Sequence, residues 1–220
     1  MISRFIFHMG LWASKKRLQQ EYGKEFYKDF VRMAGKNFNY VLPLTPDIGE
    51  STFKFNFAFT PCYIAWYKAF LSLMMDNKTA VTWIWNINEE MMLLIPRFLL
   101  KHYGAKVYLG GFRKKAPAHE INSDQNKLHA YDYKIRYRAI DEHTFEIDFY
   151  QCGMKRLCEE QGAAGLFPGV CRIDYLISHY IGCGFCRTKT LGDGDEVCNC
   201  RYSTHGHCSW PLEEGLTEKK

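Results

Sequence analysis

The sequence predicts an α+β fold, in which a helical N-terminal half packs on a small antiparallel sheet in the C-terminal half. Two observations support this prediction. In the first third of the chain, apolar residues recur at three- and four-residue steps, which is the period of an amphipathic helix. Strict alternation of apolar and polar residues, which indicates a half-buried strand, begins only at Tyr131.

Composition and length indicate how the chain is organised. It has 220 residues, of which 47% are hydrophobic and 24% charged, so it can bury a core without covalent cross-links. We therefore expect one α+β domain over residues 1–204. Its parts are a mainly helical half (1–110) and a sheet-containing, cysteine-rich half (128–204), and a flexible tail (205–220) follows.

The N-terminal half has three helical patterns. The first spans Leu11 to about Phe38, with its apolar residues among Lys, Arg, Gln and Glu. A loop marked by Pro43, Pro46 and Gly49 follows. Two apolar helices are then expected, from about Cys62 to Met75 and from residue 79 to about Tyr103, where Gly104 would end the second. Between Gly110 and Lys127, glycines and Pro117 in a polar segment predict a long connection.

The C-terminal half predicts the element order β-β-α-α-β-β. A hairpin of residues 131–138 and 145–149 comes first, with basic residues of one strand opposite Glu146 and Asp148 as cross-strand ion pairs. Helices follow over about 152–161 and 169–181. Two strands close the domain, over about 184–191 and 197–203, with a Gly-Asp-Gly-Asp turn between them.

Charge and hydropathy exclude several classes of function. The net charge of +5 is small and spread along the chain, which argues against a nucleic-acid partner. The most apolar segment, residues 79–100, contains Glu89, Glu90 and Arg97, so we expect a buried helix and no membrane partner. We read no export signal at the N-terminus and therefore expect a cytoplasmic protein with reduced thiols. A homo-oligomer is compatible with the sequence.

Eight of the nine cysteines lie in the last third of the chain, so thiol or metal chemistry is expected there. On the second helix of this half, Cys171, Asp174 and Ser178 are spaced i, i+3 and i+7, which places a thiol, a carboxylate and a hydroxyl along one side. The pattern Cys183-x₂-Cys186 followed by Cys198-x-Cys200 allows a zinc or iron–sulfur site, as does the set Cys152, Cys171 and Cys198. We expect no cofactor and keep a cysteine-ligated metal as the alternative.

The stretch from Phe149 to Tyr202 resembles the L-2-amino-thiazoline-4-carboxylic acid hydrolase family. The residues that carry the resemblance are, in chain order, Cys152, the Cys-Arg-x-Asp element at 171–174, Arg187-Thr188-Lys189-Thr190-Leu191, Gly194-Asp195, Cys198 and Arg201. Tyr22-Gly23 and Pro46-Asp47-Ile48-Gly49 extend it toward the N-terminus. A more distant similarity is to vinyl-reductase-like small-molecule-binding domains, whose α/β fold is related to that of trafficking-complex subunits.

The resemblance implies a hydrolase that opens a cyclic amidine, 2-amino-thiazoline-4-carboxylate, to a carbamoyl-cysteine. This reaction requires attack on the amidine carbon, proton transfer and a cation for the carboxylate. Candidates for the nucleophile are Cys171 and Cys152, with Asp174 as general base or orienting group. Candidates for substrate binding are Arg187, Arg201 and Ser178. The alternative function is a non-catalytic small-molecule-binding or sensing domain.

Overall fold

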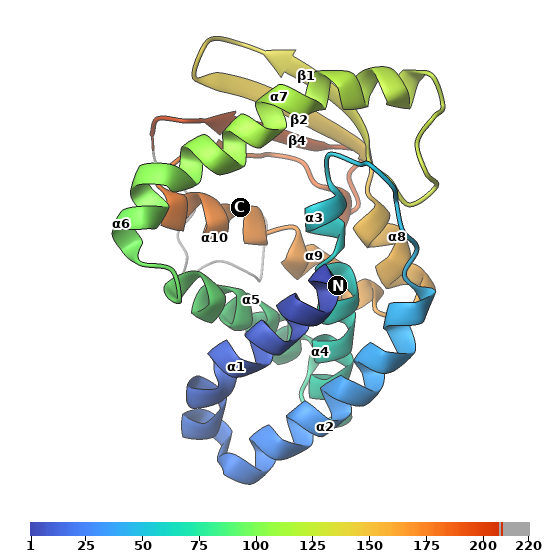
Figure 1. The fold of residues 1–220 in the computed structure, drawn as a ribbon. Helices are drawn as coiled ribbons and strands as arrows, with labels where there is room; N and C mark the ends of the chain where they lie inside the picture. Colours follow the sequence, from blue (N-terminus) through green and yellow to red (C-terminus); the bar gives the residue numbers. More distant parts are fainter. Residues whose placement is uncertain (207, 209–220) are drawn as a thin grey trace.

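The structure is a computed structural model that describes residues 1–206 and residue 208. Most of the expected tail, 205–220, therefore lies outside the described residues. The chain forms helices in its N-terminal half and a four-stranded antiparallel sheet in its C-terminal half, which confirms the predicted α+β class (Figure 1). One continuous set of buried hydrophobic residues includes members of both halves.

The helical half begins with α1 and α2, which meet at Gly23. A single helix was predicted here, and that prediction was wrong because Gly23 has φ of +90°, a conformation open to glycine that interrupts the helix. The bounds are α1 (Ile2–Tyr22), α2 (Lys24–Val41), the short 3₁₀ helix η1 (Leu42–Leu44), α3 (Lys54–Phe57), α4 (Thr60–Ser72) and α5 (Asn77–Leu93).

The helical path does not stop at Gly104 as predicted. After Pro96 the chain continues through α6 (Arg97–Leu99) and the π-helical turn η2 (Leu100–Gly104) into α7 (Ala105–Asp124). The connection predicted between residues 110 and 127 is therefore mostly helix. The reason is an apolar stripe at helical spacing, which buries Leu109, Phe112, Ala116 and His119 and outweighs the two glycines and Pro117.

The sheet has the order β1-β2-β4-β3, and all its neighbours are antiparallel. Its bounds are β1 (Lys134–Ala139), β2 (Thr144–Gln151), β3 (Gly184–Cys186) and β4 (Cys198–Ser203). The predicted hairpin is present, and Arg138 of β1 forms ion pairs with Glu146 at 2.9 Å and Asp148 at 2.8 Å. In Figure 1, α7 crosses one face of this sheet, and α10 lies on the side nearer the helical half.

Between β2 and β3 the chain is helical, as predicted, but the second expected helix is divided. The elements are α8 (Gly153–Glu160), the 3₁₀ turn η3 (Ala164–Leu166), α9 (Phe167–Val170) and α10 (Ile173–Ile181). Cys171 and Arg172 occupy the break between α9 and α10. The first of the two closing strands was predicted to reach Leu191, but β3 ends at Cys186, and residues 187–197 form a loop containing the 3₁₀ turn η4 (Leu191–Asp193).

No helix among the described residues is long and apolar enough to cross a bilayer.

Candidate active site

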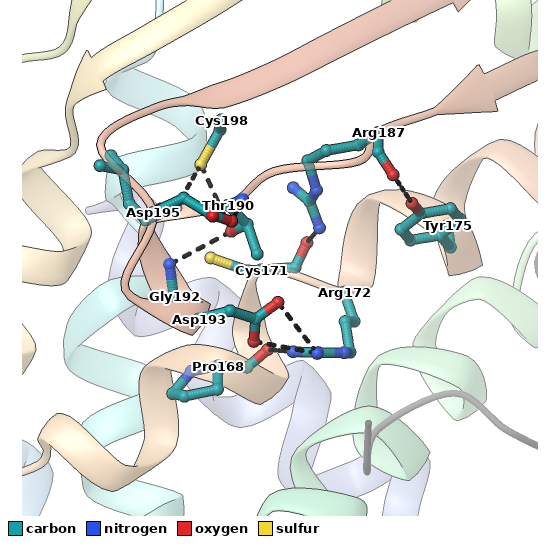
Figure 2. A network of polar contacts seen from close by, with 11 residues as sticks. Pro168, Cys171, Arg172, Tyr175, Arg187, Thr190, Gly192, Asp193, Asp195 and Cys198 are labelled. Carbon is teal, nitrogen blue, oxygen red and sulfur yellow. Dashed lines mark hydrogen bonds and ion pairs between the residues drawn. The ribbon is translucent and has the colours of Figure 1, made fainter. Parts of the chain in front are cut away.

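The candidate site lies where the break between α9 and α10 meets the loop between β3 and β4 (Figure 2). Cys171 comes from the helix break and Cys198 from the first position of β4. Both side chains are buried, with residue exposures of 9% and 6%. Two thiols that are 27 positions apart in the sequence are thus neighbours in the fold.

The sulfur of Cys198 is placed to be a thiolate. The Leu191 backbone N–H donates to it at 3.1 Å, and the Thr190 hydroxyl lies 3.4 Å away. Thr190 Oγ1 also accepts the N–H of Gly192, so the hydroxyl proton is available to the sulfur. The pKa of Cys198 is lowered to about 6, first by hydrogen bonding with the Cys171 thiol and then by these donors and Arg187, against the opposing effect of burial.

The pKa of Cys171 shifts in the opposite direction. Its pKa is raised well above the usual thiol range, chiefly by its interaction with Cys198 and then by burial. Because the two thiols share one ionisation, the pair holds one proton and one negative charge near neutral pH. A beta carbon added to Gly192 would lie 2.8 Å from the Cys171 sulfur, so the η4 backbone packs directly against that thiol.

Arg187 supplies the positive charge beside the thiol pair. Its side chain is 5% exposed, donates to Asp174 Oδ2 at 3.3 Å and also donates to the carbonyl oxygen of Cys171. The Tyr175 hydroxyl donates to the backbone carbonyl of Arg187 at 3.1 Å, and the guanidinium lies over the Tyr175 ring. The cation is therefore held between α10 and the start of the β3–β4 loop.

Asp174 is the more accessible member of this ion pair. Its side chain is 29% exposed. Burial raises its pKa above the usual carboxyl range, and Arg187 opposes that rise. A partly exposed carboxylate with a raised pKa can exchange protons with water or a bound molecule.

A second ion pair fixes the loop that carries Leu191. Arg172, in the helix break, donates to both carboxylate oxygens of Asp193 at 3.0 and 3.2 Å, and its side chain is 4% exposed. At the other end of the loop, Asn199 Oδ1 accepts the backbone N–H groups of Thr188 and Lys189. These contacts hold the loop backbone in place around the Cys198 sulfur.

Among the other residues expected from the sequence, Cys152 lies at the N-cap of α8 close enough to Cys198 and Asp174 to feel their charges, and its pKa is raised to about 12 by burial. Ser178 is fully buried, and its backbone carbonyl accepts the N–H of Cys183. Arg201 is remote from the thiols. It alternates with Cys200 along β4, is 51% exposed and pairs with Glu146 across the outer face of the sheet.

The four cysteines of the pattern Cys183-x₂-Cys186 and Cys198-x-Cys200 do not form one set of metal ligands. Cys183 is buried, whereas Cys186 is exposed on β3, and Cys198 and Cys200 share the inner face of β4. Within the described residues, no three His, Cys, Asp or Glu side chains are grouped so that they could hold a metal ion.

Several residues that build the site did not stand out in the sequence. Leu191 and Gly192 act through a backbone N–H and close packing, which no side-chain pattern reveals. The Thr190 hydroxyl and the Asp193 carboxylate act through contacts that only the folded loop creates. Asn199 did not stand out either, because its role depends on the position of the Thr188 and Lys189 backbone, whose N–H groups its side chain accepts. The one available signal was the run Arg187-Thr188-Lys189-Thr190-Leu191, which carried the family resemblance.

Comparison with known proteins gives one match. Residues 99–202 match the family described as L-2-amino-thiazoline-4-carboxylic acid hydrolase. The matched region begins at the end of α6 and includes α7, the sheet except for the last residue of β4, and both sides of the candidate site. This match supports the family suspected from the sequence. Neither curated proteins nor solved structures give a match to the chain.

Proposed function

We propose that this chain is a hydrolase, because residues 99–202 match the L-2-amino-thiazoline-4-carboxylic acid hydrolase family. Its substrate in this proposal is a cyclic amidine that carries a carboxylate, such as 2-amino-thiazoline-4-carboxylate, and its product is a carbamoyl-cysteine. The observation that supports this most strongly is the Cys171 and Cys198 pair, in which one sulfur is held as a thiolate.

Cys198 is the attacking sulfur in this proposal, although Cys171 and Cys152 were the candidates from sequence. Its thiolate adds to the electrophilic amidine carbon, which forms a carbon–sulfur bond. The bond from that carbon to a ring heteroatom then breaks, and the Cys171 thiol delivers the proton that the departing atom needs. The Leu191 N–H and Thr190 hydroxyl stabilise the same sulfur when it departs as a thiolate.

Water completes the reaction. Asp174 removes a proton from a water molecule that attacks the amidine-derived carbon, and the carbon–sulfur bond to Cys198 breaks. The proton taken by Asp174 then passes to the Cys171 thiolate, so one water has been added to the ring and both thiols and Asp174 are back in their starting states. Arg187 positions Asp174 and contributes positive charge for the substrate carboxylate, because a guanidinium has five N–H donors and only part of them is used by Asp174 and the Cys171 carbonyl.

The test is release of carbamoyl-cysteine from the thiazoline, measured by mass spectrometry. Cys198→Ser is expected to lower kcat by about 10⁴-fold or more, and Asp174→Asn by about 10²–10⁴-fold. Cys186→Ser is the matched control, because Cys186 is an exposed thiol on β3, and it should retain activity.

Two results would contradict the proposal. Full activity of Cys198→Ser would exclude the covalent route, although a direct attack by water activated at Asp174 would remain. Tight binding of the thiazoline by the wild-type protein without any turnover would favour the small-molecule-binding alternative.

A further inference from the structure

Large hydrophobic side chains are exposed in two separate segments of the helical half. Between them, α1 and residues 93–107 hold most of the exposed large hydrophobic side chains of the described chain. Those in these two segments include Trp12 at 66%, Phe98 at 69% and Val107 at 71% exposed. The run from Leu93 to Leu99 is exposed at every position. Contiguous apolar exposure of this kind marks an interaction surface more often than it occurs by chance.

The same two segments contain a single carboxylate, Glu21 near the end of α1. Residues 1–20 and residues 91–119 lack Asp and Glu entirely. Their cationic residues are Arg4, Lys15, Lys16, Arg17, Arg97, Lys101, Lys106, Arg113, Lys114 and Lys115. Exposed apolar groups are thus interleaved with positive charge and not with negative charge.

The fold brings the two segments together. Trp12 and Leu94 line one surface depression, and Lys15, Lys16 and Lys24 line it with them. Two carboxylates of α5, Glu89 and Glu90, are paired with Arg17 at 3.1 and 3.5 Å. Glu21 and Glu25 follow Gln20 and Lys24, which also line the depression. In Figure 1 the chain runs on from the end of α5 to α6. We call the exposed side chains of α1 and of residues 93–107 the α1–α6 edge.

We propose that the α1–α6 edge docks on an anionic lipid surface. Lys side chains can lay their aliphatic stems along the apolar boundary while their ammonium groups reach the lipid phosphates, and Trp, Phe and Leu side chains enter the interfacial region. A second copy of the chain fits this edge poorly, because two such surfaces would bring like charges together.

This docking differs from a membrane span. We expected no membrane partner because no segment is apolar enough to cross a bilayer. A protein that lies on the surface needs only an exposed apolar edge with cations beside it.

The experiment is co-sedimentation of the full chain with two kinds of vesicle, phosphatidylcholine alone and phosphatidylcholine mixed with phosphatidylserine. Binding is expected only to the mixed vesicles and should weaken as salt is raised. The double variant Lys15→Gln, Lys16→Gln should bind about 30-fold more weakly, since each lysine contributes about fivefold. Leu94→Ser combined with Phe98→Ser should also lose binding, by about tenfold for each residue.

Matched controls come from exposed residues elsewhere. Phe55 is 59% exposed on α3, and Lys36 is exposed on α2, so Phe55→Ser and Lys36→Gln should bind as the wild type does. All variants change exposed side chains, and circular dichroism checks that each remains folded.

Four outcomes would overturn the proposal. The first is no binding to the anionic vesicles. The second is an equal loss of binding in the Phe55→Ser and Lys36→Gln controls. The third is a dimer, seen by light scattering without vesicle binding, that dissociates in the Leu94→Ser, Phe98→Ser variant, which would make the edge an interface between copies. Retained binding to an acidic protein in the absence of lipid affinity would likewise replace the lipid with a protein partner.

Discussion

The backbone N–H of Leu191 points at the sulfur of Cys198 from 3.1 Å. Leu191 opens the η4 turn, and Cys198 opens β4, so a loop folds back on the strand that follows it. A backbone donor aimed at sulfur stabilises the thiolate over the thiol. The loop conformation, and with it the Arg172 to Asp193 ion pair that holds the loop, therefore helps to set the reactivity of Cys198.

The first prediction concerns the reactivity of Cys198 toward iodoacetamide as a function of pH. Alkylation in the native protein should rise with a midpoint near pH 6, because the pKa of Cys198 is lowered to about 6. In Cys171→Ala the midpoint should move upward, since Cys171 is the largest cause of that lowering. Peptide mass spectrometry measures the rate at each cysteine. Buried Cys158, whose pKa is raised by burial, is the internal control and should stay unmodified.

The Cys171 and Cys198 pair also predicts how the free energy of unfolding depends on pH. The folded-state pKa of Cys198 is about 6 and its ordinary value is 9.0, so the unfolded chain binds more protons between these values. The free energy of unfolding should therefore gain up to about 1.4 kcal/mol per pH unit from this pair as pH rises from 6 to 9. Above 9 the raised pKa of Cys171 reverses the sign, because the unfolded chain then loses a proton that the folded pair retains.

Urea titrations of the wild type and Cys198→Ala at several pH values isolate this contribution from that of other titrating groups. The difference in unfolding free energy between the two proteins should widen from pH 6 to 9. A difference that is constant over this range would show that Cys198 is not a thiolate in the folded state.

Removal of Arg187 should destabilise the protein strongly. Arg187→Gln leaves Asp174 without its cation and the Cys171 carbonyl without its donor. Breaking a buried pair costs about 3–5 kcal/mol, and the partial exposure of Asp174 places the expected loss at the lower end. Arg201→Gln is the matched control on the outer face of the sheet, where an exposed ion pair contributes at most about 1 kcal/mol. Equal losses in unfolding free energy for the two variants would contradict the buried role of Arg187.

Sequence patterns anticipated the elements whose side chains alternate clearly between buried and exposed. The hairpin of β1 and β2 was predicted from the alternation around Ile135 and Ile147, and the structure buries both residues. By contrast, α7 was taken for a connection because Gly110, Gly111 and Pro117 weaken a helix, and only packing of the Leu109 to His119 stripe against the rest of the fold compensates.

In the candidate site, too, some features followed from side-chain patterns and others depended on tertiary packing. The pairing of Cys171 with Cys198 follows from tertiary structure. From the sequence, the two cysteines were grouped only as members of one motif and, with Cys152, as an alternative set of metal ligands. The helix-face argument placed Cys171, Asp174 and Ser178 together, but the break at Cys171 and Arg172 separates the thiol from the helix that carries the other two. Backbone donors such as the Leu191 N–H belong to every residue type, so no pattern of side chains could single one out.

Packing at Gly192 gives the last prediction. A beta carbon at this position would lie 2.8 Å from the Cys171 sulfur and 3.2 Å from the alpha carbon of Pro168, and the second neighbour is backbone that cannot turn aside. Gly192→Ala should therefore push η4 away from the helix break and cost about 1–3 kcal/mol of unfolding free energy. The same shift moves the Leu191 N–H off Cys198, so the alkylation midpoint of Cys198 should rise as well.

Gly110→Ala is the matched control, because that glycine lies exposed within α7 with no atom near its beta position, and the substitution should raise stability by about 0.5–1 kcal/mol. If Gly192→Ala kept wild-type stability and an unchanged alkylation midpoint, close packing of η4 on Cys171 would not be what holds the thiolate donors in place.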